Sequence, residues 1–155
     1  MIREFVARGG GLMLLGGHKA FDLGGIQNSL LGELLPVTFI SGSAPALAGL
    51  GRPVALVKAA AHPTTEALDL STGPLAFWWH RAQPKPAATT LLALANGEPA
   101  IVAGNFGKGR VLCVLLTCHG DPQAGQTAFW QWAPWPILLR DLCWWTSGRE
   151  DARFE

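Results

Sequence analysis

The chain has 155 residues, of which 49% are hydrophobic and 15% charged, and its formal net charge is +1. This composition excludes an intrinsically disordered chain. The basic residues form no block, which argues against a dedicated nucleic-acid-binding protein. No apolar run approaches the roughly 20 residues of a membrane-spanning helix, and the N-terminal residues are unlike a signal peptide. We therefore expect a cytoplasmic protein with no membrane contact.

The N-terminal third predicts alternating helix and strand. Residues Ile2–Arg8 have the pattern of a helix end, and the glycines after them are typical of helix termination. Leu12–Leu15 is a fully apolar run, which predicts a strand covered on both faces. A second helix is predicted over Ile26–Leu35, before Pro36. This rhythm indicates an α/β sheet, in which one or more βα units would normally precede the first helix.

The middle of the chain has weaker signals. Short strands are predicted at Val37–Ile40 and Val54–Lys58, separated by a loop over Ser41–Arg52. Residues 64–70 predict a short helical turn, and Leu75–Trp79 is a short apolar segment.

The C-terminal half has the clearest pattern. Segments Thr89–Leu94, Ala100–Ala103 and Arg110–Thr117 are separated by glycine-containing turns, which predicts an antiparallel meander. A polar loop is predicted over Cys118–Thr127. Apolar residues at helical spacing then predict a helix over Trp135–Trp145. We expect one domain over residues 1–147, followed by a charged tail over residues 148–155.

Cysteine and tryptophan usage is unusual. The three cysteines, Cys113, Cys118 and Cys143, form no CxxC pair, so we expect buried, reduced thiols. Seven tryptophans lie at Trp78-Trp79 and towards the C-terminus, while tyrosine is absent. We interpret the tryptophans as core residues along one edge of the sheet. The alternative is an aromatic recognition surface.

Two segments resemble a known family. They are FVARGGGLMLLGGHKAFDLGGIQNSLLGELLPV near the N-terminus and PAIVAGNFGKGRVLCVLLTCHGDP, followed by FWQW and WPILLRDLCWW. Both are similar to the glutamine amidotransferase group of the class I glutamine amidotransferase-like superfamily. The resemblance implies an α/β fold, a flavodoxin-like three-layer α/β/α sandwich in which the strand ending at Leu15 is central. It also implies that the first βα units are absent from this chain.

The family's catalytic cysteine has no counterpart in the matching segment. In active members of the superfamily, this cysteine sits on a sharp G-x-C-x-G turn between a strand and a helix. The corresponding residues here are Leu15, Gly16 and Gly17, followed by His18. None of them carries a thiol or hydroxyl that could attack a carbonyl. The resemblance therefore implies a domain without glutaminase activity.

The second part of the family's apparatus has a counterpart. Active members carry H-x-E after a later strand, and this chain has His119-Gly120-Asp121 at the corresponding place. Asp121 could still orient the imidazole of His119. We take these two residues as catalytic candidates or as remnants of a catalytic pair. The ligand-binding candidates at the same sheet edge are Gly16, Gly17, His18 and Cys118.

Two functions remain open from the sequence. The first is a non-catalytic domain that binds a small molecule or a protein partner. The second is a hydrolase or amidotransferase that uses His119 and Asp121 with water or an unidentified nucleophile. No ligand spacing supports a metal site, and we expect no cofactor. Since the predicted strand Leu12–Leu15 is apolar and its flanking units are missing, we expect a homo-oligomer or a partner protein. His62 and His80 show no partner in the sequence, and we assign them structural roles.

Overall fold

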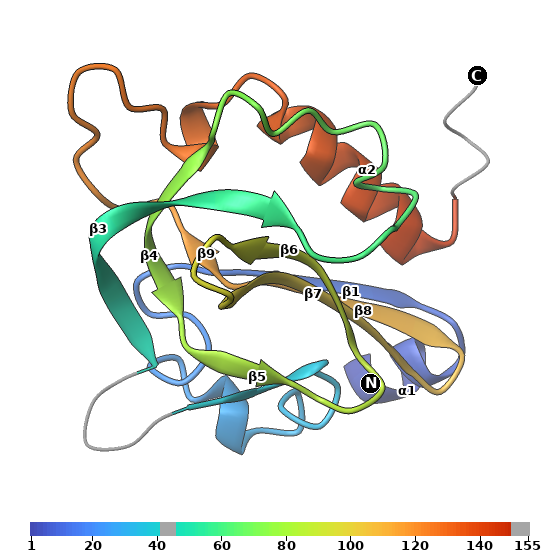
Figure 1. Cartoon of the computed structure of the whole chain (residues 1–155). Helices are drawn as coiled ribbons and strands as arrows, with labels where there is room; N and C mark the ends of the chain where they lie inside the picture. The colour runs from blue at the N-terminus through green and yellow to red at the C-terminus, as the bar shows by residue number, and fades with distance from the viewer. Residues whose placement is uncertain (41–45, 150–155) are drawn as a thin grey trace.

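The computed structural model describes residues 1–40 and 46–149 (Figure 1). Within them, seven strands form one mixed sheet in the order β1-β8-β7-β6-β3-β4-β9, and β2 and β5 form a separate two-stranded sheet. The strands are β1 (Gly11–Leu15), β2 (Val37–Phe39), β3 (Leu47–Lys58), β4 (Leu75–His80), β5 (Ala82–Pro84), β6 (Thr89–Leu94), β7 (Pro99–Phe106), β8 (Gly109–Val114) and β9 (Leu116–Thr117). The helices are α1 (Ile2–Ala7) and α2 (Trp135–Ser147). The α/β class is confirmed.

The predicted meander is present. β6, β7 and β8 pair antiparallel in succession, and β1 then pairs with β8 in parallel. The predicted strand Arg110–Thr117 is divided at Leu115 into β8 and β9. Up to Leu115, whose backbone N–H donates to the carbonyl of Ala100, the chain pairs with β7, and from Leu116 it pairs with β4. This division moves the residues after Thr117 towards β4.

β1 lies at the edge of the sheet. Among the described residues it pairs only with β8, so the central position implied by the family resemblance is not seen in this chain. Its residues are only partly buried, and Leu15 is 50% exposed. The predicted covering of both faces is found only in part: Leu12 and Leu14 pack against one apolar cluster and Met13 against the other, but no residue of β1 is fully buried.

Apolar side chains pack on both faces of the sheet. Alternate residues of β8 point to opposite faces, as expected for a strand. Leu112 and Val114 join a cluster that α2 covers through Leu138. Val111 and Cys113 join the other cluster. That second cluster includes Val6 of α1 and the buried residues Phe21 and Leu35. The meander is thus the shared centre of two cores.

α2 matches its predicted position. Its buried residues Trp135, Leu138, Leu142 and Thr146 recur at helical spacing. The helix ends at Gly148, whose φ of 74° lies in the left-handed region that glycine adopts easily. Trp79, Trp132 and Trp135 are buried, which confirms the interpretation as core for these three, whereas Trp78 and Trp130 are only partly buried.

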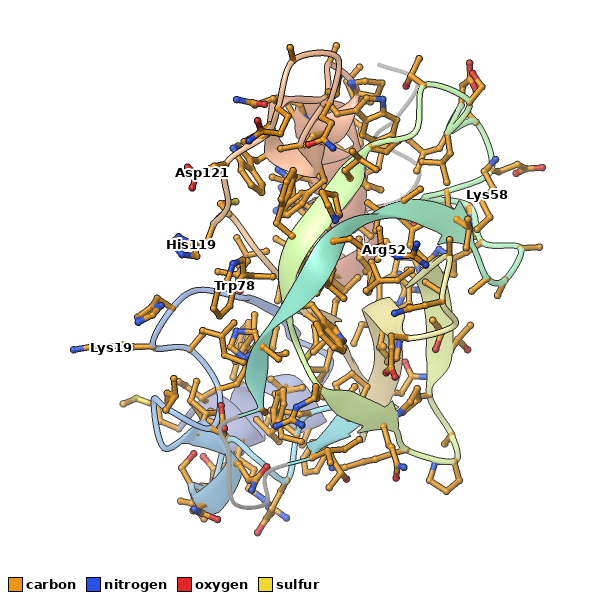
Figure 2. All side chains as sticks on the ribbon, turned by 60° about the vertical axis from the view of Figure 1, so that its left-hand side comes forward. Lys19, Arg52, Lys58, Trp78, His119 and Asp121 are labelled. Atoms are coloured by element: carbon orange, nitrogen blue, oxygen red, sulfur yellow. The ribbon has the colours of Figure 1, made fainter. Side chains whose placement is uncertain are left out.

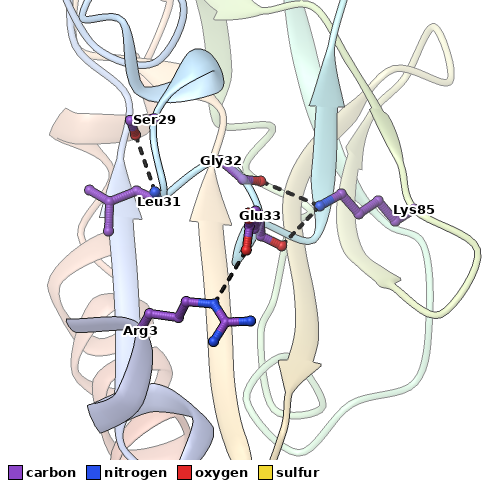
Figure 3. Close-up of polar contacts among 6 residues, drawn as sticks. All are labelled: Arg3, Ser29, Leu31, Gly32, Glu33 and Lys85. Atoms are coloured by element: carbon purple, nitrogen blue, oxygen red, sulfur yellow. Dashed lines mark hydrogen bonds and ion pairs between the residues drawn. The ribbon is translucent and has the colours of Figure 1, made fainter. Parts of the chain in front are cut away.

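The predicted helix over Ile26–Leu35 is wrong. Only Ile26–Asn28 forms a short 3₁₀ turn, and Ser29 is extended (φ −104°, ψ 169°). The Ser29 hydroxyl donates to the carbonyl of Ile26 and accepts the N–H of Leu31, so it competes with helical hydrogen bonding. Figure 3 shows how the following residues are held instead. The ammonium of Lys85 donates to the carbonyls of Gly32 and Glu33, at 3.4 and 3.2 Å.

The remaining differences concern the middle of the chain. β3 begins at Leu47, inside the predicted loop Ser41–Arg52, because its first half pairs with β4. Residues 41–45 of that loop and residues 150–155 of the predicted tail lie outside the described residues. Residues 63–67 form a turn that ends before Leu70. Within the described ranges, no helix has the length and apolar character needed to cross a membrane.

Candidate functional site

The candidate site lies where β1 and β9 end. β1 and β8 run parallel, with Leu15 opposite Val114, so the two strands end at the same side of the sheet. The turn after β1 and the loop after β9 therefore leave the sheet on the same side, where β1 and β8 have their carboxyl ends. This arrangement brings two histidines together: the ring centroids of His18 and His119 are 6.2 Å apart.

His119 stands between two other rings. Its ring centroid lies 5.2 Å from that of Trp78 on β4, and both its contacts are edge-to-face. Figure 2 shows Trp78, His119 and Asp121 on the same side of the molecule, with Lys19 projecting away below them. His18 and His119 are exposed, whereas Trp78 is partly buried. The site is an open aromatic row at the sheet edge.

Gly120 fixes the loop that carries His119. Its φ is 133°, a region that other residues rarely adopt, and a Cβ there would lie 2.5 Å from Cβ of Phe77. The loop backbone therefore lies directly on Phe77. The backbone N–H of His119 donates to the carbonyl of Thr117 at 2.7 Å, which holds the loop start against β9.

Asp121 is exposed and is not joined to His119. In the described part of the chain, no hydrogen bond links its carboxylate to the imidazole. Instead, the backbone carbonyl of Asp121 accepts a hydrogen bond from Nε2 of Gln123 at 3.2 Å. His119 and Asp121 face solvent as neighbours and not as an oriented pair.

The turn after β1 is built around close backbone packing. A Cβ on Gly16 would lie 2.3 Å from the carbonyl oxygen of Leu116, so the end of β1 touches β9 and only glycine fits. The N–H of Gly16 already donates to the carbonyl of Val114 at 2.8 Å. This group is therefore not free to bind an anion. The carbonyl of Gly17 accepts the N–H of Ala20 at 3.0 Å, which closes a turn around His18 and Lys19.

A histidine that the sequence assigned a structural role, without a partner, lies buried beneath this turn. His80 is fully buried, and its Nε2 lies 3.1 Å from the carbonyl oxygen of Gly17. Its ring contacts Phe21 and Phe39, with centroids 4.8 and 6.4 Å away. Burial lowers the pKa of His80, against the opposing effects of the Gly17 carbonyl and Asp22. Its partners are distant in sequence, so no local motif signals this role.

The cysteines differ from expectation. Cys113 is buried, as predicted, but Cys118 and Cys143 are exposed. Partial burial of the thiol nevertheless raises the pKa of Cys118, which disfavours the nucleophilic thiolate. Among the residues that the structure describes, no three histidine, cysteine, aspartate or glutamate side chains are grouped to hold a metal ion.

A groove continues from the aromatic row. It has a volume of about 540 Å³ and runs from His119 and Asp121 across Phe77 and Trp78 towards Arg52 on β3. Figure 2 labels four of these residues: Arg52, Trp78, His119 and Asp121. The groove combines aromatic surface with charged groups, a combination common in ligand-binding sites.

Comparison with known families identifies the family of this chain. A family model described as "Putative glutamine amidotransferase" matches residues 1–147. The chain belongs to this family. A search of curated proteins finds no match.

Solved structures show how much of this fold the chain contains. The chain is 26% identical to the cytoplasmic protein STM1381 of Salmonella typhimurium LT2, with a TM-score of 0.80. It is 24% identical to the cytoplasmic protein STM3548 of Salmonella typhimurium, with a TM-score of 0.79. The matches cover 94% of this chain but only 59% and 58% of those chains. This glutamine amidotransferase-like chain thus spans about three fifths of the length of both relatives.

A more distant likeness concerns the fold alone. A β-galactosidase from Rahnella sp. R3 matches 92% of this chain with a TM-score of 0.57 and 15% identity, over 20% of its own length.

Proposed function

We propose that this chain is a glutamine amidotransferase-like domain without glutaminase activity, which binds a ligand or a partner at the edge of the sheet described above. One observation carries the proposal. The residues at the end of β1, which we match to the family's cysteine turn, are Leu15, Gly16 and Gly17, and none has a nucleophilic side chain.

The backbone at this position supports the same conclusion. A nucleophile elbow is a strained strand-to-helix turn that exposes its central side chain beside free N–H groups. Among the described non-glycine residues, only Phe21 has a positive φ, of 57°. β1 is followed by a turn and not directly by a helix, and the N–H of Gly16 is already bonded. The turn therefore lacks the strain of a nucleophile elbow, and the N–H that would directly follow a nucleophile at Leu15 is not free to stabilise an oxyanion.

Cys118 is a poor substitute for the missing nucleophile. Its raised pKa keeps the thiol protonated near neutral pH. A cysteine nucleophile requires a base in hydrogen-bond contact or a neighbouring cation, and within the described chain the structure records neither for its sulfur. We assign Cys118 to the surface of the site.

A binding role fits the open groove. A ligand there would contact the rings of Trp78 and His119, while Asp121 and Arg52 supply polar contacts. His18 lies next to His119, beside the groove. Gly16 and Gly17 shape the adjacent turn. The ligand is a small molecule of unassigned structure, held without a resident cofactor.

A second candidate function rests on the exposure of His119. An exposed imidazole beside a groove can act as a general base towards water, which would make the domain a hydrolase with no protein nucleophile. The absence of a hydrogen bond to Asp121 in the described chain weighs against this reading, because nothing fixes the imidazole's tautomer.

Further observations support an expected architecture and location. With apolar clusters on both faces of the sheet, and with α1 and α2 among the elements covering them, the chain fits a partial flavodoxin-like α/β/α sandwich. The protein STM1381 is described as cytoplasmic, and we place this chain in the same compartment.

The unpaired edge of β1 favours association with a second copy or a partner protein. The strand is entirely uncharged, and edge strands of stable monomers are usually protected by charge, proline or a covering element. Leu15, the last residue of β1, is 50% exposed, and Phe5 on α1 is 60% exposed. A groove of about 640 Å³ runs past Met13 and Trp144. These features support an interface along β1.

Ammonia release from glutamine tests the main proposal. We expect no turnover above background from the unmodified chain. The His119→Ala variant is the matched control: turnover by the unmodified chain that disappears in this variant would replace our proposal with the enzyme candidate. A Leu15→Cys variant asks whether a thiol alone restores activity, and we expect that it does not, because the Gly16 N–H that would follow the thiol is already bonded to Val114.

A further inference from the structure

We infer that His80 is a positioning residue, whose Nε2–H group holds the Gly17 carbonyl and thereby sets the place of His18 beside His119. This inference rests on the proposed function, since it concerns the same sheet edge. It is tested by readouts that do not depend on any ligand or reaction.

The first step is the proton on His80. A carbonyl oxygen only accepts hydrogen bonds, so the contact of 3.1 Å requires that Nε2 carries the proton. Nδ1 is buried and has no hydrogen-bond partner among the described residues. Because burial lowers the pKa of His80, the ring remains neutral near pH 7, with a bare lone pair on Nδ1. His80 therefore exists as the Nε2–H tautomer.

The second step is what the Gly17 carbonyl supports. The same oxygen accepts the N–H of Ala20, and between Gly17 and Ala20 lie His18 and Lys19 at the tip of the turn. Both hydrogen bonds thus converge on one atom at the base of the turn that carries His18. The position of this atom limits how closely the His18 ring can approach His119, 6.2 Å away.

The third step is that His80 itself cannot move. It is fully buried and stands at the end of β4, where its backbone N–H donates to the carbonyl of Leu115 at 2.8 Å. Phe21 packs edge-to-face on its ring at 4.8 Å, and Phe39 stacks on Phe21 at 4.7 Å. Phe21 adopts a positive φ of 57°, a conformation that persists only where its surroundings over-determine it.

The neighbouring Asp22 completes this support. Its Oδ2 accepts the backbone N–H of Ala46 at 2.5 Å, which ties the segment after the turn to the start of β3. Its Oδ1 is buried and has no hydrogen-bond partner among the described residues. The turn over residues 17–20 is therefore held at its base by His80 and at its far end by Asp22, while His18 itself faces solvent.

Two variants separate positioning from simple packing. His80→Gln places an amide N–H where Nε2–H stood, and His80→Leu fills the space without a donor. We expect a nuclear Overhauser contact between the His18 and His119 rings in the unmodified chain, retained in His80→Gln and lost in His80→Leu. His62→Leu is the control, because His62 bonds Thr64 and contacts Trp145 away from the site. It should leave the contact unchanged.

Nitrogen-15 spectra test the inference on the unmodified chain, so this test does not depend on whether a variant folds. We expect His80 to show the Nε2–H tautomer at pH 7 to 8. An Nδ1–H tautomer, or a His18–His119 contact that survives in folded His80→Leu, overturns the inference. Neither result bears on glutaminase activity, so failure here and failure of the proposed function are distinguishable.

Discussion

Replacing Leu15 with lysine should weaken association through the β1 edge. Leu15 is 50% exposed in the single chain, so an interface can bury at most the remaining half of its surface. Since complete burial of a leucine side chain contributes about 1.5–3 kcal/mol, half contributes about 0.8–1.5 kcal/mol. Two copies meeting along β1 double this to about 1.5–3 kcal/mol, which is a change of about 10- to 150-fold in the dissociation constant.

Sedimentation velocity over a concentration series measures this change. The matched control is Val57→Lys, because Val57 is 39% exposed on β3, which β8, β7 and β6 separate from β1. We expect Leu15→Lys to dissociate at higher concentration than the unmodified chain, and Val57→Lys to behave like the unmodified chain. Equal effects of the two variants would refute an interface at β1. So would an unmodified chain that stays monomeric at high concentration and binds no hydrophobic dye.

Three further predictions concern stability. Gly120→Ala should lower the free energy of unfolding by about 1–3 kcal/mol more than Gly125→Ala, because both glycines have positive φ but only a Cβ on Gly120 would meet a side chain, that of Phe77. Equal losses in denaturant unfolding would contradict this packing. Because burial lowers the pKa of His80, the unfolded chain binds more protons, and the free energy of unfolding should decrease as the pH falls below about 6.5. This decrease should be smaller in His80→Gln, and an identical pH profile would count against a neutral buried ring. Ile101→Ala should cost about 2–5 kcal/mol in thermal or denaturant unfolding, while Leu30→Ala, at a residue that is 73% exposed, should cost little.

The sequence was most informative where structure depends on local patterns. The meander over β6, β7 and β8 follows from alternating segments and glycine turns, and α2 follows from helical spacing with Pro136 in its first turn. The family resemblance also predicted that His18 and His119 lie at one edge of the sheet, and the parallel pairing of β1 with β8 agrees with this.

What the sequence could not predict depends on contacts between distant residues. The helix expected over Ile26–Leu35 fails because Ser29 bonds locally and Lys85, more than 50 positions away, takes the carbonyls of Gly32 and Glu33. His80 had no visible partner because Gly17 is 63 positions away. The edge position of β1 depends on which strands are present, and an apolar run alone does not encode it.

Trapping with an electrophilic glutamine analogue tests the central claim most directly. The purified chain is incubated with the analogue, with and without excess glutamine, and labelled residues are mapped by mass spectrometry. Iodoacetamide serves as the control for general reactivity of the exposed thiols Cys118 and Cys143. Our account predicts no adduct whose formation glutamine slows. A glutamine-protected, one-to-one adduct at the end of β1 or in the loop after β9 would show that the site retains a nucleophile and would contradict the proposed function.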